Sequence, residues 1–360
     1  MPIINDFVVK EDICNMRCEY CLTGTSSFKK TASYNTDEKK NSLQYKTGSD
    51  LKKNMDQITN SIADAFDISI LKISGGEILL IKGLIDFIRE QSERHKVVQL
   101  LTNGMLLTQP LISQLKEVGN VCIQISLDHY RAEGNEYRTK TQKQLEIILD
   151  NLDMVIQAKI PTEINCVLHN KNTPIIKEFA DYLLKYDKQV TLYPFPIRGN
   201  NRMGFYPEPE QLKDVREILN HFDKYQGILP PIEYMKHLLM FLEKGRREVK
   251  CVFPRIAIGS FEDGNITPCA NYWFLSLGNV LKEDSSAVFN KVTSAGIYDV
   301  LMNDSHRLKE CKQCFTPWEV LNLYAIGKIS MEELCSLPLY SFKGVKDSIL
   351  KMFKNKWELI

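Results

Sequence analysis

Short apolar runs alternate with longer segments of helical periodicity between residues 7 and 195 of this 360-residue chain. Such alternation is typical of repeated strand–helix units and predicts a parallel sheet. Six strands are expected, each followed by a returning helix: Asp6–Glu11, Ile68–Ile73, Val97–Thr102, Val121–Leu127, Thr162–His169 and Val190–Pro194. Six units of this kind predict an α/β fold, a partial (β/α)6 TIM-like barrel.

The pattern changes after Pro194, where a connector rich in Pro, Gly and Asn leads into two helical segments, Glu210–Tyr225 and Ile232–Arg246. Beyond residue 250, short strand-like runs at Arg255–Gly259 and Asn265–Pro268 meet at the turn signal Asp263-Gly264. We therefore expect a barrel over residues 1–200, a helical bridge over 201–250 and a smaller α+β domain over 251–360.

Composition narrows the class of protein. The formal net charge is +1, with 46 basic and 45 acidic residues, so no bulk field favours a nucleic acid as partner. No uninterrupted apolar stretch is long enough to span a membrane, and the N-terminus lacks the pattern of a secretory signal, so we expect a cytoplasmic protein. Ten cysteines in that compartment favour metal ligation or redox chemistry over disulfides.

Three of these cysteines, Cys14, Cys18 and Cys21, form the pattern C-x3-C-x2-C directly after the first predicted strand. A closed [4Fe-4S] site uses four cysteine thiolates, so a loop with three leaves one iron open to an outside ligand. A zinc site is the alternative, but zinc sites usually pair two C-x2-C units or add histidines, and no such partner lies nearby in the sequence.

With Tyr20 just before its third cysteine, this pattern resembles the radical S-adenosylmethionine (SAM) superfamily. The resemblance implies a [4Fe-4S] cluster on the three cysteines that binds SAM and cleaves it to a 5'-deoxyadenosyl radical, with a flavodoxin- or ferredoxin-type electron donor. Further matches follow in the order of the family's barrel and imply SAM contacts at the strand ends: Gly75, Gly76 and Glu77 for the amino group, Asn103, Ser126, and Arg138 for the carboxylate.

Four more cysteines lie in the last third of the chain: Cys251, Cys269, Cys311 and Cys314. They resemble the Twitch domain, the shortened form of the SPASM domain, and imply one auxiliary [4Fe-4S] cluster. A zinc ribbon on the same four thiolates is the alternative, because sulfur ligation alone does not distinguish the metals.

The remaining cysteines and the histidines give weaker indications. Cys122 and Cys166 lie in apolar strands and are expected to pack in the core. Cys335 fits an amphipathic helix, an alternative cluster ligand or a hydrogen-atom donor. His129 and His169 lie at strand ends, where surface or supporting roles are expected, and no acid or base is assigned. The polar segment Thr23–Asp50 has the composition of a mobile lid loop.

Two substrate hypotheses fit the resemblance. The first is maturation of a ribosomally made peptide by epimerisation or cross-linking. The second is dehydrogenation of a small sugar or aminocyclitol-like metabolite, which gains from the fact that only thirteen residues precede Cys14, too few for a leader-binding domain. A resemblance to two-cluster enzymes of molybdenum cofactor biosynthesis adds a third class. A zinc-stabilised binding protein without catalysis remains the alternative outside this superfamily.

Overall fold

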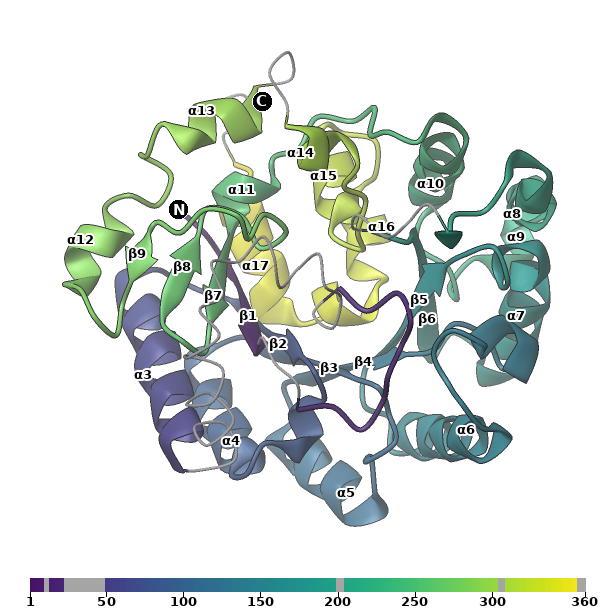
Figure 1. Ribbon diagram of the computed structural model, residues 1–360, viewed down its shortest axis with the longest axis horizontal. Coiled ribbons are helices and arrows are strands. Elements are labelled where there is room, and N and C mark those ends of the chain that lie inside the picture. Colours follow the sequence, from purple (N-terminus) through teal and green to yellow (C-terminus); the bar gives the residue numbers. More distant parts are fainter. Residues whose placement is uncertain (10–12, 23–48, 199–203, 304–307, 355–360) are drawn as a thin grey trace.

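A computed structural model describes residues 1–9, 13–22, 49–198, 204–303 and 308–354. Within these residues, nine strands form one sheet in the order β6-β5-β4-β3-β2-β1-β7-β8-β9 (Figure 1). The six predicted strands are present and pair in parallel: β1 (Ile4–Val9), β2 (Ile70–Gly75), β3 (Val97–Thr102), β4 (Val121–Ser126), β5 (Thr162–Leu168) and β6 (Val190–Pro196). The sheet curves but ends at β6 and β9 without closing, so the predicted partial barrel is confirmed.

Helices between these strands cover the convex side of the sheet (Figure 1). In α4, Leu84, Phe87, Ile88 and Gln91 are buried, a spacing that places one stripe of the helix on the sheet. The helices of this layer are α3 (Ser49–Ala65), α4 (Leu84–Arg94), α5 (Gln109–Val118), α6 (Gln142–Gln157) and α7 (Ile176–Leu183). The proposed lid, Thr23–Asp50, falls almost entirely outside the described residues.

The concave interior of the sheet is polar at several buried positions. Register aligns Lys72 of β2 with Gln99 of β3, and Gln124 of β4 with Glu163 of β5, so these side chains share one face. Glu163 accepts hydrogen bonds from Gln99 Nε2 at 2.8 Å, Gln124 Nε2 at 2.9 Å and Leu339 N at 3.3 Å. Burial raises the pKa of Glu163 to about 7, although these donors and Lys72 oppose the rise.

The last third of the chain extends the same sheet. Strand β7 (Ala257–Phe261) pairs in parallel with β1, and β8 (Asn265–Thr267) returns antiparallel to it, followed by β9 (Gly278–Asn279). The hairpin predicted at Asp263-Gly264 is confirmed, with Gly264 at φ 87°. The strand expected at Arg255–Gly259 begins later, because a short helix, α11 (Phe253–Ile256), precedes it.

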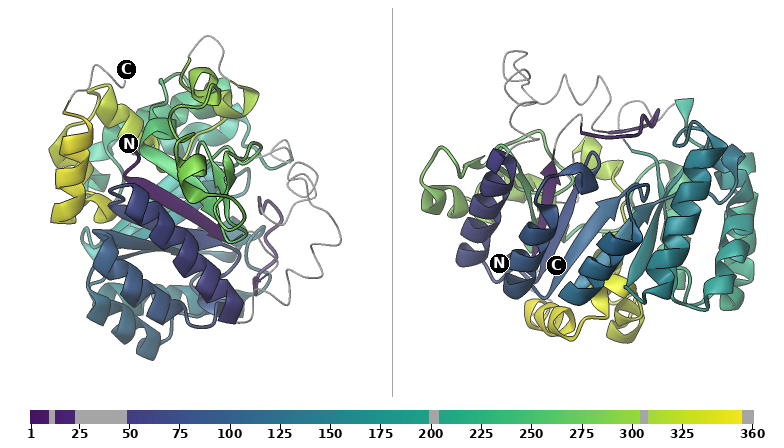
Figure 2. Two further views of the ribbon diagram at one scale, coloured as in Figure 1. Left: turned by 90° about the vertical axis from the view of Figure 1, so that its left-hand side faces the viewer. Right: turned by 90° about the horizontal axis from the view of Figure 1, so that it is seen from below.

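The remaining helices lie at the side and at one end of the sheet. The predicted segment Glu210–Tyr225 is divided into η6 (Pro209–Leu212), α8 (Lys213–Asn220) and α9 (Phe222–Tyr225), and α10 spans Ile232–Lys244. Figure 2 shows the C-terminal helices, in yellow, at the end of the strands opposite to the purple cysteine loop. Here Ser348 Oγ lies 2.5 Å from Ser69 Oγ, just before β2. The short helices of this region are α12 (Ser285–Phe289), α13 (Ile297–Met302), α14 (Lys309–Lys312), α15 (Glu319–Ala325), α16 (Met331–Cys335), η7 (Pro338–Tyr340) and α17 (Lys343–Met352).

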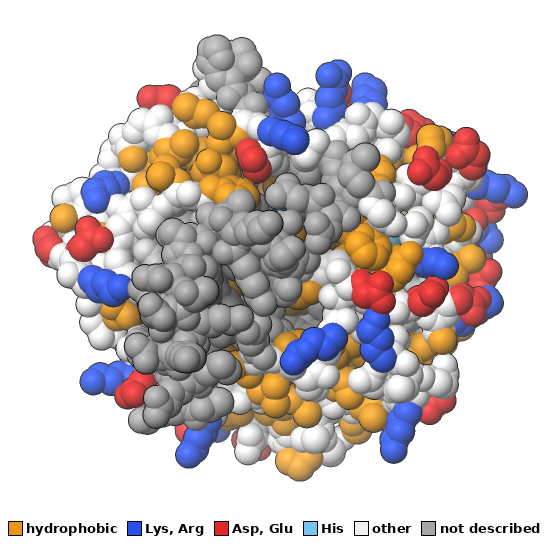
Figure 3. Space-filling view, in the orientation of Figure 1, with side chains coloured by type: hydrophobic (Ala, Val, Ile, Leu, Met, Phe, Trp, Pro, Cys, Tyr) orange, Lys and Arg blue, Asp and Glu red, His pale blue; other side chains and the backbone are white. Residues whose placement is uncertain are grey.

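The surface carries both signs of charge, in agreement with the nearly equal numbers of basic and acidic residues. On the face shown in Figure 3, basic and acidic side chains alternate around the rim, and apolar side chains gather between them. Among the described helices, none is both long and apolar enough to cross a bilayer.

Candidate active site

The cysteine loop follows β1 at the C-terminal end of the sheet. Cys14, Cys18 and Cys21 are partly exposed, and Met16 N donates a hydrogen bond to Cys14 Sγ at 3.4 Å. Burial raises the pKa of the Cys18 thiol to about 11, although the Arg138 charge opposes this. An iron ion would reverse this effect by binding the thiolate.

The Gly75-Gly76-Glu77 motif lies where β2 ends, as expected. A Cβ on Gly75 would lie 2.2 Å from the Val9 carbonyl oxygen, and its φ is 147°, so this close approach of β1 and β2 requires glycine. The Glu77 carboxylate is buried and accepts from Thr102 Oγ1 at 2.7 Å and from Asn103 N at 2.7 Å. Glu77 therefore joins the ends of β2 and β3, and its contact with a SAM amino group remains a prediction.

The next two predicted contacts lie beside this motif. Asn103 Nδ2 donates to Asn15 Oδ1 in the cysteine loop at 2.6 Å, so the end of β3 holds that loop. Ser126 is the last residue of β4 and pairs with Asn165 of β5. Both side chains are largely buried at the same end of the sheet.

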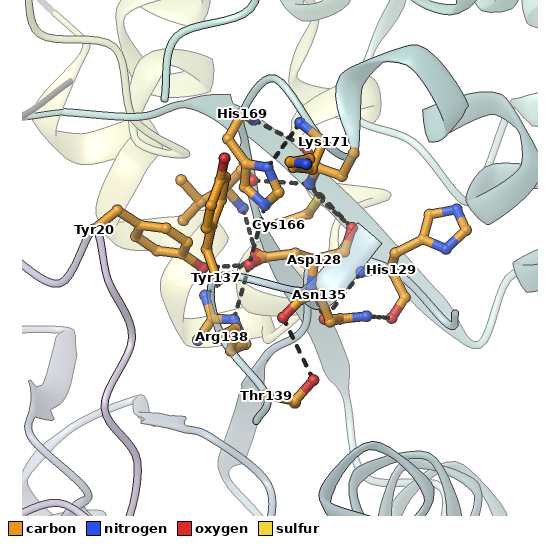
Figure 4. A network of polar contacts seen from close by, with 12 residues as sticks. Tyr20, Asp128, His129, Asn135, Tyr137, Arg138, Thr139, Cys166, His169 and Lys171 are labelled. Atoms are coloured by element: carbon orange, nitrogen blue, oxygen red, sulfur yellow. Dashed lines mark hydrogen bonds and ion pairs between the residues drawn. The ribbon is translucent and has the colours of Figure 1, made fainter. Parts of the chain in front are cut away.

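A network centred on Asp128 fixes the third side of the site (Figure 4). Arg138 donates to Asp128 through Nε at 3.1 Å and through Nη2 at 3.2 Å, and Tyr20 donates its hydroxyl to the same carboxylate. Val167 N adds a bond at 3.0 Å, whereas His169 Nε2 lies 3.7 Å away, beyond hydrogen-bond distance. Asp128 is completely buried, which favours the neutral acid, yet the Arg138 charge lowers its pKa to about 2.

This network gives Arg138 a protein partner and adds Asp128, a functional candidate that sequence reasoning missed. The guanidinium expected to meet the SAM carboxylate is already bound to a protein carboxylate, so its role toward SAM remains a prediction. Asp128 gave only the signal of a polar residue at a strand end, which commonly caps the following segment. Its connection to Tyr20 is long-range and was not visible in the spacing.

A cavity opens beneath the cysteine loop, with about 1030 Å³ of space when its solvent-open part is included. Cys18, Cys21, Tyr20, Gly75 and Arg138 line one part of its wall. Another part of its wall comes from the last third of the chain and includes Asn271, Trp273, Thr316 and Trp318. The cavity is therefore shared between the barrel strands and the segments that carry the C-terminal cysteines.

Those C-terminal cysteines line a second pocket. Cys251, Cys269, Cys311 and Cys314 all line a space of about 470 Å³, together with Asn271, Thr316 and Trp318 of the first cavity. Two donors face the sulfurs: Asn271 N lies 3.5 Å from Cys269 Sγ, and Asn322 Nδ2 lies 3.8 Å from Cys251 Sγ. The residues thus fit a thiolate-bound group, because N–H donors directed at sulfur are a feature of iron–sulfur sites.

Both candidate metal sites consist of cysteine thiolates, the ligands of iron–sulfur clusters and of structural zinc. Within the part of the chain that the structure describes, no three His, Cys, Asp or Glu side chains are drawn together as a completed metal site. Identity of the metal therefore rests on the chemistry of the donor set, which is all thiolate at both positions.

The secondary candidates have supporting roles. Cys122 and Cys166 are completely buried in β4 and β5, as expected. Cys335 lies in α16 with Sγ 3.4 Å from Met331 Sδ and lines neither pocket. His129 and His169 are buried rather than on the surface, and each accepts a backbone N–H through Nδ1 in the loop after its strand.

Comparison with curated proteins identifies relatives of modest similarity. The PqqA peptide cyclase of Rhizobium meliloti is 22% identical over 254 residues, covering 67% of this chain and 66% of the cyclase. The GTP 3',8-cyclase of Helicobacter pylori is 25% identical over 187 residues, covering 51% of this chain and 52% of the cyclase. The chain therefore spans about half to two thirds of the length of these relatives.

Solved structures share the fold. SuiB of Streptococcus suis bound to its precursor peptide SuiA matches 85% of this chain and 66% of its own, with a TM-score of 0.54 and 11% identity. The enzyme anSMEcpe with bound AdoMet matches 97% of this chain and 100% of its own, with a TM-score of 0.60 and 16% identity. Residues 9–183 match the radical SAM superfamily, and with the partial barrel described above this shows that the chain carries a radical SAM domain.

Proposed function

We propose that the protein cleaves SAM reductively and uses the resulting radical to modify a ribosomally made peptide, by epimerisation or cross-linking. An auxiliary [4Fe-4S] cluster on Cys251, Cys269, Cys311 and Cys314 completes the proposal. The electron donor would be of the flavodoxin or ferredoxin type.

One observation carries this proposal. The cavity beneath Cys18 and Cys21 shares Asn271, Thr316 and Trp318 with the pocket of the C-terminal cysteines. A substrate in that cavity would lie between the two cysteine sites. In cross-linking, the electron released when the substrate radical is oxidised would then have an acceptor nearby, which a zinc site could not provide.

The chain's own residues hold and shield the reactants. A [4Fe-4S] cluster on Cys14, Cys18 and Cys21 would supply the electron that cleaves SAM into methionine and a 5'-deoxyadenosyl radical able to abstract a hydrogen atom from the substrate. Glu77 and Asn103 fix the strand ends beside that loop, and Tyr20 and Asp128 hold the loop to β4. Trp318, at 4% exposed, helps to exclude water from the cavity.

The names of the similar proteins support a peptide substrate. The relative from Rhizobium meliloti is named a PqqA peptide cyclase, SuiB is described with a precursor peptide, and anSMEcpe is described with a Cp18Cys peptide. The GTP 3',8-cyclases among the relatives are the counterexample, so the substrate class has to be tested directly.

The test is metal analysis and SAM cleavage of anaerobically reconstituted protein. We expect about eight irons and eight sulfides per wild-type chain, and about four when Cys14, Cys18 and Cys21 are all replaced by Ala. With dithionite and SAM, 5'-deoxyadenosine should form with the wild type and not with the triple variant. Zinc in place of iron, or no SAM cleavage by the iron-loaded protein, would refute the proposal.

A further inference from the structure

Lys72 is a buried cation on the wall of the reaction cavity. It lies on the inner face of β2, is 8% exposed, and lines the same cavity as Cys18 and Cys21. Its Nζ lies over the Trp318 ring at 5.1 Å from the centroid, and it makes no hydrogen bond or ion pair with another described residue. A buried ammonium that packs on an aromatic face and makes no hydrogen bond retains its capacity to bind an anion.

A second cation on the same wall also has an N–H group without a hydrogen-bond partner. Arg198 follows β6 and donates from Nη1 to Asn271 Oδ1 at 2.9 Å. Its Nε is buried and has no hydrogen-bond partner among the described residues. Buried N–H groups are nearly always paired in folded proteins, so this one indicates a missing acceptor.

Apart from the cysteine loop, the charged side chains that line the cavity leave one positive charge in excess. Lys72 and Arg198 are cationic, and Asp6 of β1 is the carboxylate on this wall, whereas Arg138 is neutralised by Asp128. Asp6 is aligned with Lys72 in the sheet and receives a long hydrogen bond from Ser74 Oγ at 3.5 Å. Burial raises the pKa of Asp6, although the charges of Lys72 and Arg198 and a hydrogen bond with Trp318 oppose the rise. Glu163, also near Lys72, is held by its own three N–H donors.

We propose that Lys72 and Arg198 form an anion-binding subsite that anchors a single carboxylate of the substrate inside the reaction cavity. This inference rests on the proposed function, since it specifies which peptides the cavity accepts. A single excess positive charge suits one carboxylate and not a triphosphate, which would bring several uncompensated negative charges against partly buried side chains. The carboxylate can come from an acidic side chain or from the C-terminus of the peptide.

Binding of small peptides to the iron-loaded, SAM-bound protein tests the subsite by isothermal titration calorimetry. The probes are Ac-Gly-Glu-Gly-NH2, its Gln analogue, the Gln peptide with a free C-terminal carboxylate, and GTP. The wild type should bind at least one carboxylate peptide about tenfold or more tightly than the neutral amide, because charged hydrogen bonds are worth more than neutral ones. Tighter binding of the Glu peptide would identify a side-chain carboxylate, and tighter binding of the Gln peptide with a free C-terminus would identify a C-terminal carboxylate.

Variants connect that preference to the two cations. Lys72→Met and Arg198→Gln should each reduce the preference to about twofold or less, while Lys72→Arg should retain most of it, because the charge remains. Lys116→Met, an exposed lysine of α5, serves as the matched control and should keep the wild-type ratio.

Each of the following binding results would overturn the inference: equal affinity for the charged and neutral peptides, no binding of a carboxylate peptide up to about 10 mM, tighter binding of GTP, or a preference that survives both substitutions. A loss of SAM affinity in Lys72→Met that matches the loss of peptide preference would also overturn it, because the cations would then hold the carboxylate of SAM. Iron content and SAM cleavage of the wild type are measured in parallel. Normal values there, with no charge preference, would reject the subsite and leave the proposed function standing.

Discussion

Replacing Asp128 by Asn tests how strongly the buried carboxylate holds the site together. The side chain is completely buried and accepts four hydrogen bonds, from Tyr20, twice from Arg138, and from Val167 N. Asparagine keeps the shape but removes the charge and one acceptor oxygen. Its amide N–H groups would also point at the N–H and O–H groups that donate to the Asp128 carboxylate.

The variant should lose stability because Arg138, the partner of Asp128, stays in place. Arg138 is 7% exposed, so its guanidinium would remain buried without a counter-charge. Removing one member of a buried ion pair costs about 3–5 kcal/mol, and we expect the lower end because asparagine retains one acceptor. Urea unfolding of the wild type and the Asp128→Asn variant, followed by far-UV circular dichroism, measures this difference. The iron content should fall as well, because Tyr20 loses its anchor beside the cysteine loop.

An exposed pair provides the matched control. Asp64 pairs with Arg94 at the surface, with 70% of the Asp64 side chain exposed, so Asp64→Asn should cost about 1 kcal/mol or less. Combining Asp128→Asn with Arg138→Met should recover at least about 2 kcal/mol relative to the sum of the single changes. Strict additivity, or a loss at Asp128 no larger than at Asp64, would show that the buried pair does not stabilise this region.

Three further predictions concern other parts of the fold. The pKa of Glu163 is about 7 in the folded state and near 4.5 when unfolded, so the native protein binds more protons than the unfolded chain between these pH values. The free energy of unfolding should therefore fall by about 3 kcal/mol from pH 4.5 to pH 7. Urea unfolding of Glu163→Gln should no longer show this pH dependence. Gly75→Ala should cost at least about 2 kcal/mol because the new Cβ meets the Val9 carbonyl oxygen, whereas Gly296→Ala, with open space around it, should be nearly neutral in the same assay. Cys269→Ala should lower the iron content from about eight to about four per chain, and an unchanged iron content would contradict a cluster at that pocket.

Much of the barrel could be predicted because parallel strands buried on both faces leave a local signal. β3 coincides with its predicted range, and the other five differ by a few residues at their ends. The C-terminal third was harder, since its strands and helices are short and depend on long-range partners. The start of β7 was placed too early because Phe253–Ile256 is apolar enough to read as a strand, although it forms one helical turn.

The candidate site shows the same division between local and long-range information. The spacing of Cys14, Cys18 and Cys21 predicted that they share one loop. The order of the motifs predicted that Glu77 and Asn103 lie at neighbouring strand ends. Spacing could not reveal that Arg138 is already paired with Asp128, because that contact depends on how the loop after β4 folds back. It also gave no indication of Lys72, which looks like an ordinary strand lysine until the strands are aligned.

The position of β1 in the sheet has a consequence for synthesis of the chain. Ile4 pairs with Ile70 on one side but with Ala257 on the other, so one edge of the first strand waits for a partner 253 positions later. At typical rates of translation that interval is on the order of ten seconds or more. During this time the cysteine loop is attached to a strand with one unpaired edge. Delivery of iron and sulfide to that loop can therefore precede completion of the sheet, and the nascent protein is most exposed to aggregation in the same interval.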